Sequence, residues 1–402
     1  MLMLTDLVRV AARLAPPAAL AAESPLRFGA RPSRGRGAGL VVVWNVCRHC
    51  NMTCPHCYVA AGGRPSPGDL DTADALKVID ALADASVSTL IVSGGEPLLR
   101  EDVFTLLERA RERGLSVQLS SNGVLIDAEV ARRLGEVGVA YVGVSIDGPA
   151  ALNDDYRGLE GGFDRAVAAL EHVRAAGLRA GLRTTLTRRN HSVLPDMLEL
   201  ARKKADRFYV SHLVYAGRGL KMMTEDLSRA ETRQSLEWLF GESARLVAEG
   251  DPLRIVTGGN DSASPLFLHW VEDNYGSEAG SRVRALLQRR GGNSAGEKLL
   301  NIDHRGRVHP DQFWQSATLG RLPADRFEDI LDHPLLHDLR SREDRLKGRC
   351  ADCGVRELCR GSHRERAEAA FGDLWAPDPA CVLTDDEVHS RLEGSREGVA
   401  HA

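Results

Sequence analysis

The residues best suited to chemistry are three cysteines, Cys50, Cys54 and Cys57, in the stretch Cys50-Asn51-Met52-Thr53-Cys54-Pro55-His56-Cys57-Tyr58. They follow an apolar run over residues 40–46, which predicts a buried strand, so one short loop brings three thiols to a strand end. Thiolates are the ligands that iron–sulfur clusters require. Because three cysteines leave one iron of a [4Fe–4S] cluster without a protein ligand, that iron can bind another molecule.

Two other interpretations of these cysteines stay open. Cys47 extends the motif to two Cys-x2-Cys pairs, which could bind zinc, although zinc modules usually have more than three residues between the pairs. A disulfide scaffold is the second alternative, for which eight cysteines in 402 residues are sparse. We interpret Cys47 as a small buried hydrophobic residue beside the cluster.

Composition and charge exclude several classes of protein. An apolar fraction of 43% and a charged fraction of 27% are ordinary for a globular enzyme. A net charge of −4 gives no indication of nucleic-acid binding, and no apolar run is long enough to cross a membrane. The apolar N-terminus carries Arg9 and Arg13 within it, which suits a short amphipathic helix better than a signal peptide. We therefore expect a cytoplasmic protein.

Strand and helix patterns alternate after residue 40. Strands are expected at 40–46, 88–92, 115–119, 139–146, 178–186 and 208–214, and helices at 72–85, 101–113, 127–136, 163–176 and 192–204. Nearly continuous apolar strands separated by helices form a parallel sheet covered by helices. The fold class is therefore α/β, and the spacing predicts a partial (β/α)6 barrel of the TIM type, with its polar loops at the C-terminal ends of the strands.

The remaining segments are arranged around this barrel. We expect an N-terminal extension and linker (1–39), the barrel (40–225), a helical connecting region (226–298), a small C-terminal domain (299–385) and a polar tail (386–402). The connecting region should begin with a long helix near 224–249, and the C-terminal domain with a hairpin over 299–310.

The cysteine motif, together with Gly94-Gly95-Glu96-Pro97, resembles the radical S-adenosylmethionine (SAM) superfamily over about residues 40–225. The resemblance implies that the amine and carboxylate of SAM chelate the open iron, and that one electron cleaves SAM to methionine and a 5′-deoxyadenosyl radical. It also implies a set of SAM-binding residues: Tyr58, Gly94, Gly95, Glu96, Pro97, Ser121, Asn122, Ser145, Asp147 and Arg183. An ordinary role at a strand end is the alternative for the last five.

Four further cysteines resemble the auxiliary-cluster domain called SPASM (or twitch). They are Cys350, Cys353, Cys359 and Cys381. The sequence departs from the SPASM pattern at His363, where a cysteine would follow Cys359 after three residues, and at His309-Pro310-Asp311 in the hairpin, where a cysteine is usual. The resemblance thus implies one auxiliary [4Fe–4S] cluster rather than two, and a four-cysteine zinc site is the alternative.

Longer segments resemble the radical SAM proteins of heme d1 biosynthesis, at residues 211–219, 308–314, 359–367 and 372–375. That resemblance implies a tetrapyrrole substrate, 12,18-didecarboxysiroheme, whose propionate side chains react. A ferredoxin or flavodoxin would be the electron donor. His212, Tyr215 and His309 are candidates to ligate the substrate iron or donate a proton, and Arg218 could bind a carboxylate, although each could instead be structural.

Three rival functions remain at this point. A related radical SAM enzyme could decarboxylate the propionates of iron-coproporphyrin to make heme. A peptide-modifying maturase could carry the same auxiliary domain, but the forty residues before the barrel are short for a peptide-recognition domain. The third is a zinc-stabilised binding protein without catalysis.

Overall fold

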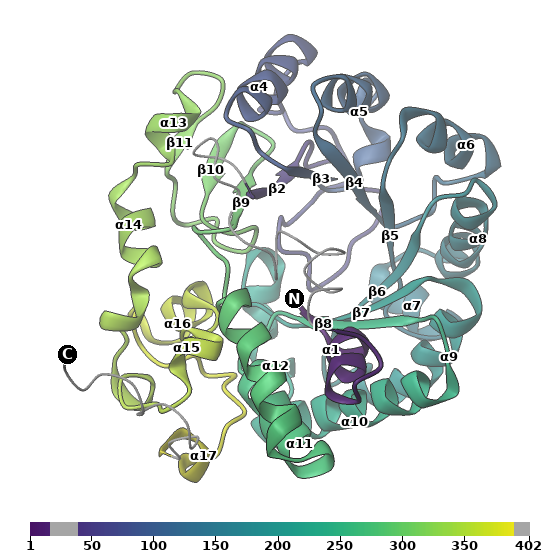
Figure 1. Cartoon of the computed structure of the whole chain (residues 1–402). Coiled ribbons are helices and arrows are strands. Elements are labelled where there is room, and N and C mark those ends of the chain that lie inside the picture. Colours follow the sequence, from purple (N-terminus) through teal and green to yellow (C-terminus); the bar gives the residue numbers. More distant parts are fainter. Residues whose placement is uncertain (17–38, 390–402) are drawn as a thin grey trace.

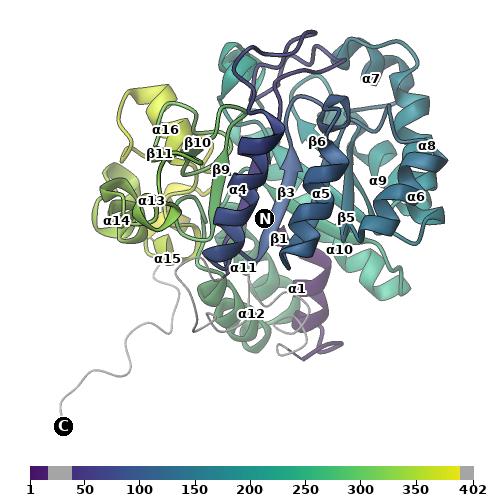
Figure 2. The same cartoon turned by 90° about the horizontal axis from the view of Figure 1, so that it is seen from above.

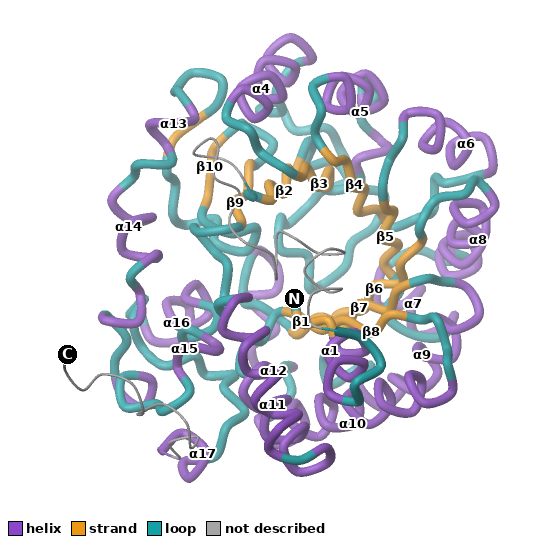
Figure 3. The backbone as a smooth tube through the Cα atoms, in the orientation of Figure 1, coloured by secondary structure: helices purple, strands orange, loops and turns teal. Residues whose placement is uncertain are grey.

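The computed structural model describes residues 1–16 and 39–389 and contains one curved sheet in the strand order β1-β8-β7-β6-β5-β4-β3-β2-β9-β10-β11. Figure 3 shows the strands as an arc with helices outside it. The strands are β1 (Leu2–Met3), β2 (Val41–Asn45), β3 (Thr89–Ser93), β4 (Ser116–Ser121), β5 (Tyr141–Ser145), β6 (Ala180–Leu186), β7 (Arg207–His212), β8 (Arg254–Gly258), β9 (Leu299–Ile302), β10 (Arg307–His309) and β11 (Gly320–Arg321).

Strands β2 to β8 run parallel, as the α/β prediction requires. Helices cover the outer face of the sheet (Figure 1). The longer helices are α1 (Leu4–Ala11), α4 (Thr72–Asp84), α5 (Val103–Glu112), α6 (Ala128–Val137), α7 (Ala150–Arg157), α8 (Gly162–Ala175), α9 (Leu194–Lys204), α10 (Arg229–Glu249), α11 (Ala263–Tyr275), α12 (Ser277–Arg290) and α16 (Arg364–Phe371). The shorter ones are α13 (Phe327–Ile330), α14 (Pro334–Arg340), α15 (Arg356–Cys359) and α17 (Asp385–His389). The predicted partial barrel is confirmed.

Local chemistry explains where the barrel helices begin. Asp71 accepts a hydrogen bond from the backbone N–H of Asp74 at the start of α4. Ser228 and Glu231 form a reciprocal capping box at the start of α10. This cap explains why α10 begins at Arg229, five residues later than the sequence pattern suggested, while residues 217–225 form a 3-10 helix.

Two elements of the barrel were not expected from the sequence. Helix α7 follows Gly148-Pro149 and contains Asn153-Asp154-Asp155, a composition typical of a loop. Strand β8 spans only five residues and ends at Gly258, within a region expected to be helical. Because β8 pairs with β7 in parallel, it extends the sheet beyond the six predicted strands.

The first residues of the chain belong to the barrel. The sequence-based boundaries place residues 1–39 outside it, whereas β1 pairs with β8 and α1 packs against α10, α12 and β8. Leu4, Leu7 and Val8 are fully buried, so α1 is amphipathic, as expected, but with its apolar face in the core. Residues 17–38 of the predicted extension and linker (1–39) and residues 390–402 of the predicted tail (386–402) lie outside the described residues.

The C-terminal domain is joined to the barrel through the sheet. Strands β9 and β10 form the predicted antiparallel hairpin, and β9 also pairs in parallel with β2. Figure 2 shows the C-terminal helices beside the barrel, next to α4 and α11. None of the described helices has the length and apolar character needed to cross a membrane.

Candidate active site

The three cysteines of the motif lie in one loop after β2. Cys50, Cys54 and Cys57 pack together around Met52 and Ala61, and all three are free thiols. Cys50 is buried, whereas Cys54 and Cys57 are half-buried. Burial raises the pKa of Cys50 to about 12, and the neighbouring cysteines contribute to that rise. Bound iron would supply the positive charge that thiolates need here, so the donor set fits an iron–sulfur site.

A buried arginine lies next to this loop. Arg157, at the end of α7, donates through Nη1 to the Cys54 sulfur at 3.9 Å and through Nη2 to Asp147 at 2.7 Å. Its carbonyl accepts a hydrogen bond from Thr53 at 3.0 Å, so it also fixes the loop backbone. Burial raises the pKa of Cys54, and the Arg157 guanidinium opposes that rise by favouring the thiolate. Sequence reasoning missed Arg157 because it did not predict α7.

Asp147 connects Arg157 to the motif itself. Its carboxylate is fully buried, accepts from the Thr185 backbone at 2.8 Å, and lies 3.2 Å from Nε2 of His56, whose ring stacks on Tyr156. Burial would raise the pKa of Asp147, but Arg157 and His56 outweigh burial and hold that pKa well below its usual range. Asp147 is therefore a buried anion that positions Arg157 and His56, and its predicted contact with SAM stays a prediction.

The turn after β3 docks against the cysteine loop. Gly95 donates to the Cys47 carbonyl at 2.8 Å, and the Glu96 N–H donates to the His49 carbonyl at 2.7 Å. A Cβ atom on Gly95 would overlap the His49 carbonyl, so only glycine allows this approach. Beside it, Gly94 is the turn's first residue, and Pro97 begins a 3-10 helix over Pro97–Leu99. The sequence motif thus sets the position of the loop.

The Glu96 carboxylate joins two strand ends. It is fully buried and accepts hydrogen bonds from Ser121 Oγ at 2.8 Å, the Asn122 N–H at 2.8 Å and the Leu98 N–H at 3.2 Å. Burial raises the pKa of Glu96 to about 7 despite these donors. The Asn122 side chain donates to Asn51, 2.7 Å away, inside the cysteine motif. Glu96 and Ser121 therefore have a structural task, and SAM binding by this group stays a prediction.

The remaining predicted SAM residues are Tyr58, in the cysteine loop, and Arg183 and Ser145, on strands of the sheet. Tyr58 donates to Asn45 at 2.9 Å, and its ring meets Phe313 edge to face. Arg183, in register with Ser145 on β5, donates to Ser120 at 2.7 Å. Arg183 is half-buried, and its guanidinium lies over the ring of Tyr209, 5.2 Å from the ring centroid.

Arg218 holds the cysteine loop from the other side. Its guanidinium donates to the carbonyls of Cys54 at 2.8 Å and Ala61 at 2.5 Å, and its N–H donates to the Cys57 carbonyl. A Cβ atom on the preceding Gly217 would overlap the Tyr58 carbonyl. These contacts make Arg218 part of the loop's scaffold rather than the free carboxylate-binding group that we considered from the sequence.

The three candidate substrate residues have different surroundings in the fold. His212, at the end of β7, is buried, and its Nε2 has no hydrogen-bond partner among the described residues. Burial, with Arg366 and His363 nearby, lowers the pKa of His212 to about 3, so its imidazole is neutral. Tyr215 donates to Asp226 at 2.8 Å. His309 lies inside the hairpin, with Nδ1 bonded to the Ala317 carbonyl at 2.7 Å.

The four C-terminal cysteines come together in a second site. All four are free and buried, between 7% and 9% exposed. Burial raises the pKa of Cys359 well above its usual value, and the charges of Cys381, Cys353 and Cys350 contribute to the rise. Four buried thiols are a possible ligand set for either a cluster or zinc.

Comparison with known proteins shows what this chain is similar to. A model of the radical SAM superfamily matches residues 44–207. The chain is 42% identical to the pre-heme d1 synthase of Dinoroseobacter shibae over 89% of each chain. It is 39% identical to the Fe-coproporphyrin III synthase of Methanosarcina barkeri, over 87% of this chain and 89% of the relative. It is also 31% identical to the AdoMet-dependent heme synthase of Nitratidesulfovibrio vulgaris, over 85% and 91%.

Solved structures share the fold at low sequence identity. SuiB of Streptococcus suis bound to S-adenosylmethionine matches with a TM-score of 0.65 and 17% identity, over 86% of this chain and 77% of that one. The structure of anSMEcpe with bound AdoMet matches with a TM-score of 0.64 and 18% identity, over 85% and 93%. Both matches extend beyond the barrel, so the C-terminal part of the fold is shared as well.

Proposed function

The chain belongs to the radical SAM superfamily, and we propose that it acts on the propionate side chains of 12,18-didecarboxysiroheme in heme d1 biosynthesis. The observation that carries this proposal is the 42% identity to a pre-heme d1 synthase over 89% of both chains. The arrangement of the first cysteine site supports the radical SAM chemistry of this proposal, because the cysteine loop, the buried Arg157 and the turn after β3 come together there.

The residues of the first site would divide the work between them. Cys50, Cys54 and Cys57 would hold a [4Fe–4S] cluster, which with bound SAM supplies a 5′-deoxyadenosyl radical. Arg157 offsets thiolate charge, and Gly95 lets the turn after β3 close against the loop. The half-exposed Arg183 offers a guanidinium fork to a carboxylate, as SAM binding would require.

The second site would hold one auxiliary [4Fe–4S] cluster on Cys350, Cys353, Cys359 and Cys381. Full ligation by four buried thiols leaves no iron open to substrate, so electron relay or structural support are the roles that this cluster could have. Iron and sulfide analysis distinguishes an auxiliary cluster from zinc. With zinc at the second site, the protein would contain only the acid-labile sulfide of the first cluster.

Of the three candidate substrate residues, His212 best suits a role in catalysis. Its imidazole is neutral, which is the form that ligates iron or accepts a proton. Its Nε2 has no hydrogen-bond partner among the described residues and is thus available to a ligand. Tyr215 is already bonded to Asp226. His309 Nε2 also has no hydrogen-bond partner among the described residues, but it lies 3.7 Å from the Asp303 carboxylate, and Nδ1 is bonded to the Ala317 carbonyl.

The direct test uses protein purified and reconstituted without oxygen. The protein is incubated with dithionite, SAM and 12,18-didecarboxysiroheme, and 5′-deoxyadenosine and the tetrapyrrole mass are followed by chromatography. We expect cofactor cleavage stimulated by the tetrapyrrole, with loss of propionate mass. Cleavage that is indifferent to this tetrapyrrole would contradict the substrate, and intact clusters without any cleavage would contradict the reaction.

A second candidate is decarboxylation of iron-coproporphyrin propionates. The 31% identity to an AdoMet-dependent heme synthase favours it. The same assay with iron-coproporphyrin III as substrate distinguishes the two, because only the correct tetrapyrrole should stimulate 5′-deoxyadenosine formation.

A further inference from the structure

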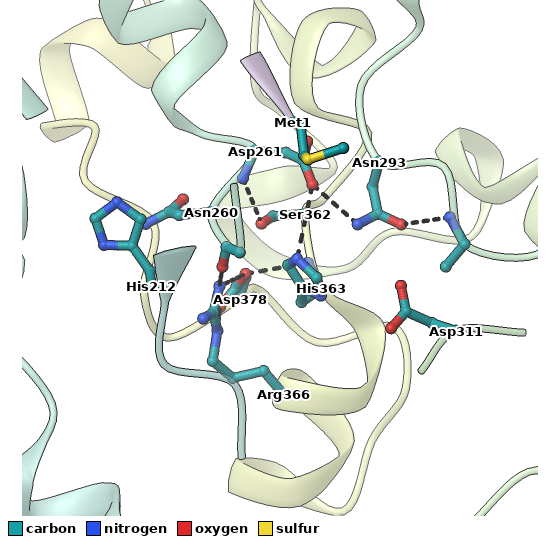
Figure 4. Close-up of polar contacts among 12 residues, drawn as sticks. Met1, His212, Asn260, Asp261, Asn293, Asp311, Ser362, His363, Arg366 and Asp378 are labelled. Atoms are coloured by element: carbon teal, nitrogen blue, oxygen red, sulfur yellow. Dashed lines mark hydrogen bonds and ion pairs between the residues drawn. The ribbon is translucent and has the colours of Figure 1, made fainter. Parts of the chain in front are cut away.

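The two positions at which the sequence departs from the SPASM pattern meet in the structure. Asp311 follows the β9–β10 hairpin, and His363 immediately precedes α16. With Glu365 they form a cluster in which one ligand atom from each side chain lies within 4.8 Å of the other two. Figure 4 shows His363 with Asp261 and Asp378 on one side and Asp311 on the other.

All three side chains of this Asp311–His363–Glu365 cluster are removed from solvent. Asp311 is 2% exposed, His363 5% and Glu365 4%. Burying two carboxylates beside one imidazole is costly unless cations or donors compensate them. Burial raises the pKa of Asp311 to about 7, and the charge of Glu365 contributes to the rise.

The neighbouring cations are already paired with other groups. Arg366 makes a two-pronged pair with Asp378 at 2.8 Å, and Arg290 pairs with Asp261 at 2.7 Å. Within the cluster, His363 Nδ1 contacts Glu365 Oε1. This ion pair leaves Glu365 Oε2 buried and, among the described residues, without a hydrogen-bond partner. The cluster therefore has a hydrogen-bond acceptor atom to which no surrounding group donates.

We propose that Asp311, His363 and Glu365 bind one divalent transition-metal ion. One imidazole nitrogen and two carboxylates are the ligands of zinc, ferrous iron or manganese sites, whereas an iron–sulfur cluster requires mainly thiolates. The metal would satisfy the unpartnered oxygen of Glu365. The site is independent of the proposed radical reaction.

The position of the cluster connects it to the first cysteine site. The ring of Phe313 packs edge to face against both His363, with 5.9 Å between ring centroids, and Tyr58, with 5.3 Å. Tyr58 directly follows Cys57. A metal at this cluster would thus lie one aromatic ring away from the loop that carries the motif cysteines.

The test measures metal binding on the intact protein with its clusters oxidised and EPR-silent. Metal-depleted protein is titrated with Mn²⁺, and free Mn²⁺ is followed by its EPR signal. Zn²⁺ is tested separately by equilibrium dialysis and metal analysis. We expect one tight Mn²⁺ per chain, displaced by one equivalent of Zn²⁺, since zinc binds such ligands more strongly.

Matched variants locate the site. His363→Gln and Glu365→Gln should weaken Mn²⁺ binding at least about tenfold. Glu368→Gln, a change of the same type on α16 at a residue bonded to Trp314, should leave binding unchanged. Circular dichroism and iron content identify any variant that fails to fold. If one of these variants does not fold, Mn²⁺ binding by Asp311→Asn and the number of Mn²⁺ ions bound by the wild type still test the site. Absence of a tight site for both metals, or equal binding by wild type and cluster variants, would overturn the proposal.

Discussion

The two cysteine sites differ in how they face their surroundings. At the barrel mouth, one loop supplies three thiols, two of them half-buried, and a buried arginine donates to one sulfur. In the C-terminal domain, separate segments supply four thiols, all at most 9% exposed. A site with an open coordination position needs access, whereas a closed site needs only ligands. From this contrast we propose that the first site is the reactive one, and that the second relays electrons or supports the structure.

The strongest test of this contrast removes one ligand from the open site. Cys54→Ala should abolish 5′-deoxyadenosine formation while about half of the iron stays bound, because the second cluster keeps its four ligands. Cys47→Ala is the matched control, since the Cys47 thiol is bonded to the Glu96 carbonyl and is not proposed as a ligand. Normal turnover by Cys54→Ala would disprove the assignment of the first site.

The next largest effect concerns the docking of the loop. Gly95→Ala places a methyl group against the His49 carbonyl, and we expect a loss of unfolding free energy of about 3 kcal/mol with poor iron retention at the first site. In Gly241→Ala, on α10, the new Cβ meets nothing within 4 Å and should stabilise the protein by about 0.5–1 kcal/mol. Denaturant unfolding and iron analysis compare the two. If the two variants had the same stability and iron content, the turn after β3 would be able to move aside for the methyl group, and the prediction would be wrong.

Removing a ligand from the closed site should have a smaller effect on catalysis. Cys353→Ala should lower the iron content while measurable SAM cleavage remains, because the first site is intact. Iron analysis and chromatography of 5′-deoxyadenosine measure both quantities in one preparation. An unchanged iron content would contradict the presence of an auxiliary cluster and favour zinc or inert thiols at this site.

The smallest predicted effect is a pH dependence from His212. Burial lowers its folded pKa to about 3, against about 6.5 in the unfolded chain, so the unfolded state binds more protons between these values. The stability that the neutral imidazole contributes is complete above pH 6.5 and is lost as pH falls. His212 alone should cost about 1 kcal/mol between pH 6.5 and pH 5.5. Urea unfolding at both pH values should show a smaller difference for His212→Gln, and an equal difference would contradict a neutral buried His212.

The sequence was most informative for features that a single local pattern can identify. Apolar runs located the six predicted strands, and cysteine spacing located both thiol sites. Arg157 could not be found in this way, because its role depends on α7 placing it beside Cys54. The sequence motif predicted Glu96 beside the cysteine loop, but its burial and its bonds to Ser121 and Asn122 depend on the meeting of two strand ends. The Asp311–His363–Glu365 cluster combines residues about fifty positions apart, so only the fold reveals it.

The pairing of β9 with β2 has a consequence for motion. The backbone of Val41–Asn45 is hydrogen-bonded to the barrel on one side and to the C-terminal hairpin on the other. A hinge between barrel and C-terminal domain would have to break this ladder, so the two should open together in hydrogen exchange rather than as separate units. A large, flat substrate would then have to enter through rearrangement of loops at the barrel mouth, and those loops should exchange faster than β2 and β9.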